Sequence, residues 1–257
     1  MDDLRKRLAF TLAEVLIVLG IIGLIAEMTI PTLMADFQKQ MQIVGLKKAY
    51  SEINQAVVQM AIAGGCPIDL SCNDVFNNTS GDPFVATTKT GNEFKKYFKL
   101  AKDCGATEET NPPPEPCFSP TTSYYFDGSG GRSFAACMFY SFTTVDGFNI
   151  MVDGNGFCVD KSPDHTNYNT NQVCGSVYVD VNGFKKPNNM GRDIFEFYIT
   201  NGKGPAIYPR GGSELLDSPS DWSWSDSSGT PQLCTPSKPY GWYCAARIME
   251  QGWQMKY

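Results

Sequence analysis

The stretch FTLAEVLIVLGIIGLIAEMTIPTLM, residues 10–34, decides how the rest of this chain is organised. Its central twelve residues, 15–26, carry no charged side chain. Extended over residues 12–30, the apolar run is long enough to cross the roughly 30 Å hydrocarbon core of a bilayer as a helix. We therefore expect one membrane-spanning helix near the start of the chain.

Charged residues and one proline frame this run. Glu14 lies near its start, and a carboxylate inside an apolar helix is costly and usually marks a function. Arg5, Lys6 and Arg7 precede the run and predict that the N-terminus stays cytoplasmic. Pro31 is expected to kink the helix or to mark its exit from lipid.

The order of residues at the start of the run resembles a known N-terminus. Ala9 offers a small residue just before a possible cut. The positions that carry the resemblance are Phe10, Thr11, Leu12, Glu14 and Pro31. Over about the first 55 residues, this pattern resembles the N-terminus of type IV prepilins and type II secretion pseudopilins. The resemblance implies that a prepilin peptidase removes residues 1–9 and methylates the new amine of Phe10.

Two other kinds of membrane-directed segment share part of this pattern. An ordinary secretory signal peptide has a basic start, an apolar centre of about 7–15 residues and a small-residue cut site. The basic start fits, but Glu14 and the length of the run do not. A simple signal anchor requires neither Phe10 nor Glu14 at this spacing.

The chemistry expected of Glu14 follows from the cost of placing a charge in lipid. Once the leader is removed, the amine of Phe10 is a positive charge at the edge of lipid, and a lone carboxylate there loses its hydration. Two neighbouring subunits can pair the amine of one with Glu14 of the other. The resemblance implies that this pairing guides entry into a growing filament. The alternative is a protonated Glu14 in lipid without a partner.

Two positions depart from the family pattern. Ala9 stands where Gly is usual, although a small residue is kept. Glu27 stands where an apolar residue is usual, near the outer end of the apolar run. The Glu27 side chain is expected either near the lipid headgroups or paired with a neighbouring subunit.

The helix is expected to continue beyond the membrane. Apolar residues recur at a spacing of three to four between Phe37 and Met60, which predicts an amphipathic helix. Gly64 and Gly65 are expected to end it. The resemblance implies a pilin-like α+β fold, with a helix at residues 10–64 and a head at residues 65–257. In that fold, the second half of the helix packs on an antiparallel sheet whose loops are stapled by disulfides.

The head is expected to be irregular over residues 66–122, apart from a short helix around residues 92–102. Beyond that point the pattern predicts four or five strands. The strand-like runs are residues 123–126, 133–144, 148–152, 176–181 and 194–199. The predicted hairpin turns are Asp127-Gly128, Asp146-Gly147, Asn155-Gly156 and Asn182-Gly183.

Length, charge and cysteine content narrow the class of protein. The chain has 257 residues, nine Cys and a formal net charge of −6. Its length permits one large or two small domains. The negative charge predicts a poor general binder of nucleic acid, because phosphate contacts need an excess of Lys and Arg. All the Cys follow the apolar run, which matches a segment exported to an oxidising space.

Pairing each Cys with its neighbour in the sequence suggests four disulfides, although the sequence alone leaves other connectivities open. The suggested pairs are Cys66 with Cys72, Cys104 with Cys117, Cys158 with Cys174, and Cys234 with Cys244. Cys137 would then be unpaired inside an apolar strand. The resemblance favours the last pair, because many pilins close a C-terminal loop with a disulfide.

A late segment groups oxygen-bearing side chains around a turn. It is YVDVNGFKKPNNMGRDIF, residues 178–195, and the side chains are those of Asp180, Asn182 and Asp193. Some secretion pseudopilins bind calcium in a late loop, so the resemblance suggests calcium as the candidate cofactor. The spacing is not that of an EF-hand. The alternative is that Asp180 and Asn182 only shape a turn.

The tail and the few catalytic residue types leave two further alternatives. Trp222, Trp224, Trp242 and Trp253 could form a stacking surface for sugars or pack a stapled loop onto the head. His165 is the only His and no Ser lies in a G-x-S-x-G motif, so a Ser–His–Asp site is poorly supported. A hydrolase with paired carboxylates stays open.

The sequence thus predicts a pilin-like subunit without enzymatic activity. It would be a single-pass protein of the bacterial inner membrane with its head outside the cytoplasm, later moved into an extracellular or periplasmic filament. Its expected partners are other pilin or pseudopilin subunits, prepilin peptidase, the inner-membrane assembly platform and membrane lipid. A type IV pilus and a type II secretion pseudopilus both stay open. The alternatives are a membrane-anchored carbohydrate-binding or adhesin module and an anchored extracellular hydrolase.

Overall fold

A single helix, α1 (Leu12–Ala63), contains the apolar run and continues well beyond it. The chain divides into two compact units, Met1–Met41 and Gln42–Tyr257, and α1 contributes to both. Within the second unit, α1 buries one stripe of side chains at three- to four-residue spacing. The stripe consists of Ile43, Leu46, Ala49, Ile53, Ala56, Val57, Met60 and Ala61. The helix ends just before Gly64 and Gly65, as predicted, and Gly65 adopts a φ of 74°.

The computed structural model describes residues 11–77, 81–107, 116–119, 139–159, 172–201, 204–210, 234 and 241–257. Several predictions therefore lie outside the described residues. These concern Ala9, Phe10, Cys137, His165, Trp222, Trp224, the run at residues 123–126 and the Asp127-Gly128 turn.

Within the described residues, six antiparallel strands form one sheet in which every strand pairs with the next one along the chain. They are β1 (Leu100–Ala106), β2 (Tyr140–Thr144), β3 (Asn149–Val159), β4 (Val173–Asp180), β5 (Ile194–Thr200) and β6 (Ala206–Pro209). The order β1-β2-β3-β4-β5-β6 is that of a meander, so each connection joins adjacent strands. The α+β layout of a long helix and an antiparallel sheet agrees with the expected fold.

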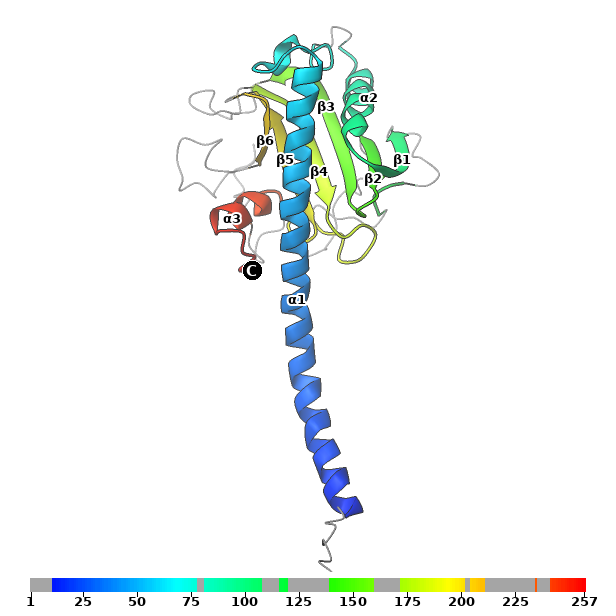
Figure 1. Ribbon diagram of the computed structural model, residues 1–257, viewed down its shortest axis with the longest axis vertical. Coiled ribbons are helices and arrows are strands. Elements are labelled where there is room, and N and C mark those ends of the chain that lie inside the picture. The colour runs from blue at the N-terminus through cyan, green and yellow to red at the C-terminus, as the bar shows by residue number, and fades with distance from the viewer. Residues whose placement is uncertain are drawn as a thin grey trace, which may run out of the picture. The chain divides into compact units, whose positions relative to one another are not determined.

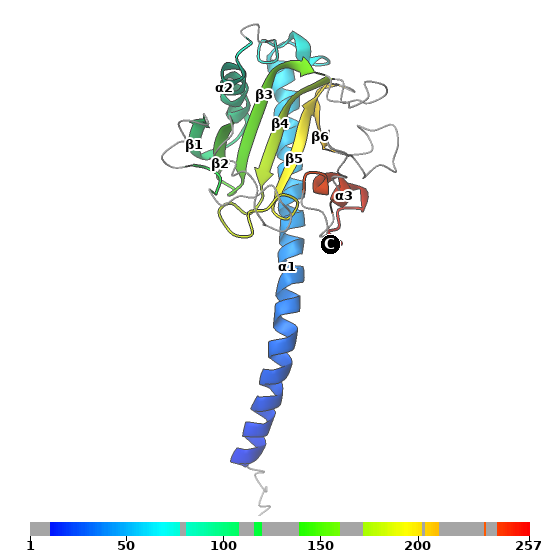
Figure 2. The same ribbon diagram turned by 180° about the vertical axis from the view of Figure 1, so that it is seen from behind.

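The two faces of the sheet are covered differently. One face packs against the buried stripe of α1, which crosses in front of the strands in Figure 1 and lies behind them in Figure 2. The strand side chains on this face are Phe142, Ile150, Val152, Val177, Val179, Phe195, Phe197 and Ile199. The other face forms a smaller cluster in which Met151, Tyr178 and Ile194 meet Phe118, Phe139 and Met190. This alternation along each strand is the expected pattern when both faces are covered.

The predicted helix at residues 92–102 is wrong in position. The structure instead has α2 (Pro83–Phe94), a 3-10 turn η2 (Lys95–Tyr97) and then β1. Asp82 caps α2, because its side chain accepts a hydrogen bond from the N–H of Phe84, and Pro83 occupies the first turn. Gly91 lets α2 lie close to the sheet, since a Cβ there would overlap the Tyr140 ring.

The turn predictions have mixed outcomes. Gly147 and Gly183 adopt φ angles of 86° and 70° in turns next to strands, which agrees with the prediction. The Asn155-Gly156 turn is wrong, because this pair lies inside β3. There the pairing of β3 with β4 is irregular between Gly154 and Val159, and Gly156 has a φ of 81°. Between these two pairs, β3 advances five residues while β4 advances two, so part of β3 has no partner residue on β4.

The structure contains the four disulfides that the sequence suggested. They join Cys66 to Cys72, Cys104 to Cys117, Cys158 to Cys174, and Cys234 to Cys244. The last one ties residue 234 to the start of α3 (Cys244–Glu250), a short helix that the sequence analysis did not predict. Disulfides of this number indicate an oxidising compartment for the head.

Candidate functional site

The first part of α1 exposes a continuous apolar surface. An 18-residue window of this helix has a mean hydropathy of 2.2, and none of that window is buried. Leu12, Met28 and Leu33 are at least 70% exposed. The helix is therefore long and apolar enough to cross a membrane, by length and composition. This segment is the first candidate functional site.

Glu14 lies in the first turn of α1, where it forms a reciprocal pair with Thr11. The N–H of Thr11 donates to Glu14 Oε2 at 2.8 Å, and the Thr11 hydroxyl donates to the same oxygen at 2.9 Å. The N–H of Glu14 in turn lies 3.3 Å from Thr11 Oγ1. This is a capping box, in which two unpaired N–H groups at a helix start are satisfied by side chains.

The capping role of Thr11 was missed in the sequence analysis. The motif that predicts it is Thr11-Leu12-Ala13-Glu14, a Thr followed three residues later by a Glu at the start of an apolar helix. Glu14 therefore has a local structural role besides any intermolecular one. The two roles are separable, because Gln can take the place of Glu at position N3 of a capping box but carries no charge.

Pro31 and Glu27 lie in the same exposed stretch of α1. Pro31 is inside the helix, so the helix continues through it. A proline has no N–H, and the carbonyl of Glu27, four residues earlier, therefore loses its usual helical donor. The side chain of Glu27 is itself exposed on the helix surface.

The three predicted calcium ligands do come together, at the end of β4 and the start of β5. Asp180 and Asp193 are both fully buried. Asn182 bridges them: its backbone N–H donates to Asp180 Oδ1, and its side-chain Nδ2 donates to Asp193 Oδ2, each at 3.1 Å. Asp193 also accepts the N–H groups of Asn188 and Asn189 at 2.8 Å. The Asp193 carboxylate thus organises the loop of residues 181–193.

This arrangement offers calcium few free oxygen ligands within the described residues. Within the described residues, Asp180 Oδ2 and Asn182 Oδ1 are buried oxygens without a hydrogen-bond partner. Calcium takes about six to eight oxygen ligands, whereas both oxygens of Asp193 are already used by N–H donors. No group of three or more His, Cys, Asp or Glu side chains suited to a metal occurs in the part of the chain that the structure describes. The geometry agrees better with the turn-shaping alternative.

Burial and mutual repulsion raise the pKa values of this carboxylate pair. Burial, together with the nearby charge of Asp193, raises the pKa of Asp180 to about 8. Burial also raises the pKa of Asp193, although its N–H donors oppose the shift. Because neither carboxylate is exposed, a substrate from solvent cannot reach this pair, and it is a poor candidate for a hydrolase site.

A second charged cluster, with Glu196 buried and Arg210 half-buried, lies on the other face of the sheet. Arg210 Nη1 lies 2.9 Å from Glu196 Oε2, and the Tyr178 hydroxyl donates to Glu196 Oε1 at 3.1 Å. The Arg210 guanidinium also lies over the Trp242 ring, 4.1 Å from its centroid. Every charge here has a partner, so this cluster holds the segment around Trp242 against the sheet.

The described tryptophans pack within the head. Trp242 stacks on Arg210, while Trp253 meets the Tyr50 ring edge-on with centroids 5.8 Å apart. The ammonium of Lys47 lies 5.6 Å from the Trp253 ring centroid. For these two residues the packing interpretation agrees with the structure, while Trp222 and Trp224 lie outside the described residues.

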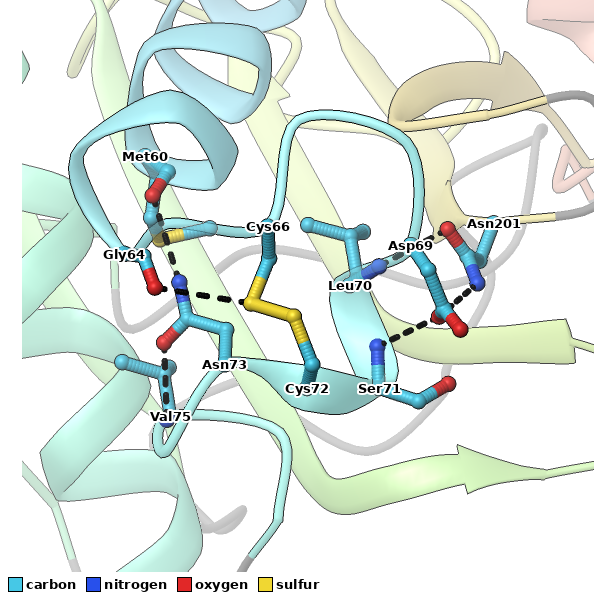
Figure 3. Close-up of a disulfide and its surroundings, with 10 residues drawn as sticks. All are labelled: Met60, Gly64, Cys66, Asp69, Leu70, Ser71, Cys72, Asn73, Val75 and Asn201. Atoms are coloured by element: carbon cyan, nitrogen blue, oxygen red, sulfur yellow. Dashed lines mark hydrogen bonds between the residues drawn. A yellow bond between two sulfur atoms is a disulfide. The ribbon is translucent and has the colours of Figure 1, made fainter.

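The end of α1 is held by the loop that the Cys66–Cys72 disulfide closes (Figure 3). Asn73 Nδ2 donates to the carbonyl of Met60 at 3.2 Å, and Asn201 Oδ1 accepts the N–H of Leu70 at 2.9 Å. A cavity of about 470 Å³ lies beside this loop, between the end of α1 and α2. The ammonium of Lys89 lines this cavity and donates a hydrogen bond to the carbonyl of Asp74. This contact holds one wall of the cavity in place.

Comparisons of the chain with protein-family models, with curated proteins and with solved structures found no match. Its function is therefore inferred from its own residues.

Proposed function

We propose that this chain is a pilin-like structural subunit, processed before Phe10 and assembled with copies of itself into a helical filament. The filament would be a type IV pilus or a type II secretion pseudopilus. Prepilin peptidase and an inner-membrane assembly platform would be its processing and assembly partners. The head would be displayed in the periplasm or outside the cell.

The observation that carries the proposal is the exposed apolar part of α1 with a carboxylate in its first turn. A helix that served only as an anchor could be capped equally by Gln, without a charge that lipid disfavours. Packed against copies of itself, the same surface would be removed from lipid and Glu14 would face a neighbour's new amine. The continuation of this helix into the core of a disulfide-bonded head agrees with such a subunit.

The proposal is tested by variants that separate the charge of Glu14 from its capping role. Glu14→Gln keeps a side chain that can accept the Thr11 N–H but removes the charge, whereas Thr11→Val removes the hydroxyl and keeps the charge. We expect Glu14→Gln to block assembly and Thr11→Val to retain it. The measurement is the amount of chain in oligomers trapped by a chemical cross-linker in whole cells of the producing bacterium.

Controls confirm that both variants reach the membrane and form their disulfides, by fractionation and by non-reducing gel electrophoresis. If Glu14→Gln assembles normally while Thr11→Val does not, Glu14 acts only as a helix cap. The assembly role proposed for its charge would then be rejected.

A further inference from the structure

We infer that Glu27 makes a second charged contact between copies of this chain, and that its partner is Lys39 of a neighbouring copy. This inference rests on the proposed function, because it needs apolar helices of different copies to lie side by side. Both residues lie on α1 within the first unit of the chain, and the Glu27 side chain is exposed.

The first argument concerns depth in the membrane. Glu14 and Glu27 are thirteen residues apart, which corresponds to about 20 Å along a helix. The hydrocarbon core of a bilayer is roughly 30 Å thick, and tilting the helix only brings the two carboxylates closer in depth. Both therefore cannot lie outside the core on opposite sides, and at least one of them lies inside it. Because the two carboxylates lie about 20 Å apart, one cation cannot serve both, so a polar contact of Glu27 is separate from that of Glu14.

The second argument concerns the backbone at Glu27. Pro31 has no N–H, so the carbonyl of Glu27 lacks its helical donor. In lipid, a carbonyl freed in this way is satisfied by a neighbouring helix, a Ser or Thr side chain, an ordered water or a local change of helix geometry, and a donor from another copy is one of these. Glu27 thus presents two acceptors, its carboxylate and its carbonyl. A lysine ammonium has three donors and can serve both.

The third argument identifies the donor. Lys39 is the only basic residue in residues 10–46. The next two lysines are engaged in the head, since Lys47 lies over Trp253 and Lys48 pairs with Asp146 at 2.8 Å. Among side chains of the exposed helix, Lys39 is therefore the cation available to Glu27.

The geometry requires that the pair form between copies. Twelve residues separate Glu27 from Lys39, which is about 18 Å along the helix and about 120° around it. The two side chains of one chain therefore cannot meet. Copies related by a helical repeat contact each other through different faces, so Glu27 of one copy can meet Lys39 of a copy displaced by about 18 Å.

A charge-swap experiment in the full-length chain tests this pair. We expect Glu27→Lys and Lys39→Glu each to reduce cross-linked oligomers by roughly tenfold or more, because each leaves two like charges in contact. The double swap should restore oligomers to within about threefold of the wild type. Gln40→Lys adds a charge to the same helix segment at an exposed position that does not face Lys39, and it should leave assembly intact. Membrane fractionation and non-reducing gels show whether each variant inserts and folds.

A membrane-permeant carbodiimide, which joins a carboxylate to an amine in contact with it, provides an independent measurement. In the wild type, we expect a covalent dimer whose joined peptides contain Glu27 and Lys39. Failure of the double swap to restore assembly, or joined peptides that link Glu27 to another amine, would overturn the pair. If Glu14→Gln still blocks assembly in that case, the proposed function survives. A wild-type chain that forms no oligomer at all would reject both.

Discussion

Glu14 and Asp180 are two carboxylates in apolar surroundings that the chain treats in different ways. Glu14 lies on an exposed helix, and both the N–H and the hydroxyl of Thr11 donate to one of its oxygens. Asp180 is fully buried in the head, and its Oδ2 has no hydrogen-bond partner within the described residues. Glu14 is thus exposed on the helix surface, whereas Asp180 is enclosed by the head.

The raised pKa of Asp180 makes the stability of the head depend on pH. Its pKa is about 8 in the folded chain, against about 3.9 for an unfolded Asp. Between these two values the folded state binds more protons than the unfolded state. The free energy of unfolding should therefore fall as the pH rises from about 4 to about 8.

Asp180→Asn should weaken this pH dependence, because the amide keeps the acceptor for the Asn182 N–H and cannot ionise. At pH 8 we expect the variant to be more stable than the wild type by about 1–3 kcal/mol, with a much smaller difference at pH 5. The measurement is denaturant unfolding of the full-length chain in detergent with EDTA. Asp74→Asn, at an exposed position, is the control and should change little. Equal pH profiles for Asp180→Asn and the wild type would contradict this account.

At the scale of elements, α1 combines two kinds of helix in one continuous segment. Toward its start, apolar side chains are exposed on all sides, which suits lipid or other apolar helices. From Ile43 onward, only one stripe is apolar and buried, and it packs on the sheet. The change from a uniform to a periodic apolar pattern is visible in the sequence itself.

Substitutions on opposite sides of this second part should differ sharply in cost. Ile53 is fully buried against the sheet, and Ile53→Ala is expected to destabilise the head by about 2–4 kcal/mol. Ile62 is 61% exposed on the same helix, and Ile62→Ala should change stability by less than about 0.5 kcal/mol. Denaturant unfolding of both variants gives the comparison. Similar costs for the two substitutions would show that the helix packs on the sheet through another face.

The elements predicted from the sequence were those with a strong local pattern. The long helix, its end before Gly64 and Gly65, and the strands that became β2 to β5 all carry clear periodicity or turn residues. The α2 helix was not predicted, although Asp82 and Pro83 mark its start, because the aromatic residues at and after its end form the stronger local pattern. Nothing local distinguishes β1, which is a strand because it pairs with β2.

The candidate site residues follow the same division. The grouping of Asp180, Asn182 and Asp193 was predictable, because a turn brings nearby residues together. That Asp193 would be used by backbone N–H groups depends on the path of residues 181–193 and was not predictable. The four suggested disulfides agree with the structure, since short loops bring neighbouring Cys together at little entropic cost.

At the scale of the whole molecule, three features belong together. The chain has an apolar helix able to cross a membrane and a head with disulfides. The second part of the same helix packs on one face of the sheet in that head. An exported, membrane-linked protein accounts for all three. In the proposed filament, the apolar helices of neighbouring copies pack against each other, and Glu14 and Glu27 make the two polar contacts between them.

The most direct test of this account is the mass of the mature N-terminus. The protein would be purified from membranes of the producing bacterium, and its N-terminal peptide analysed by mass spectrometry. We predict that it begins at Phe10 with a methylated amine, which exposes the charge that Glu14 is proposed to meet. A chain that still begins at Met1, or one cut beyond Pro31, would contradict the account, because that amine would then be absent.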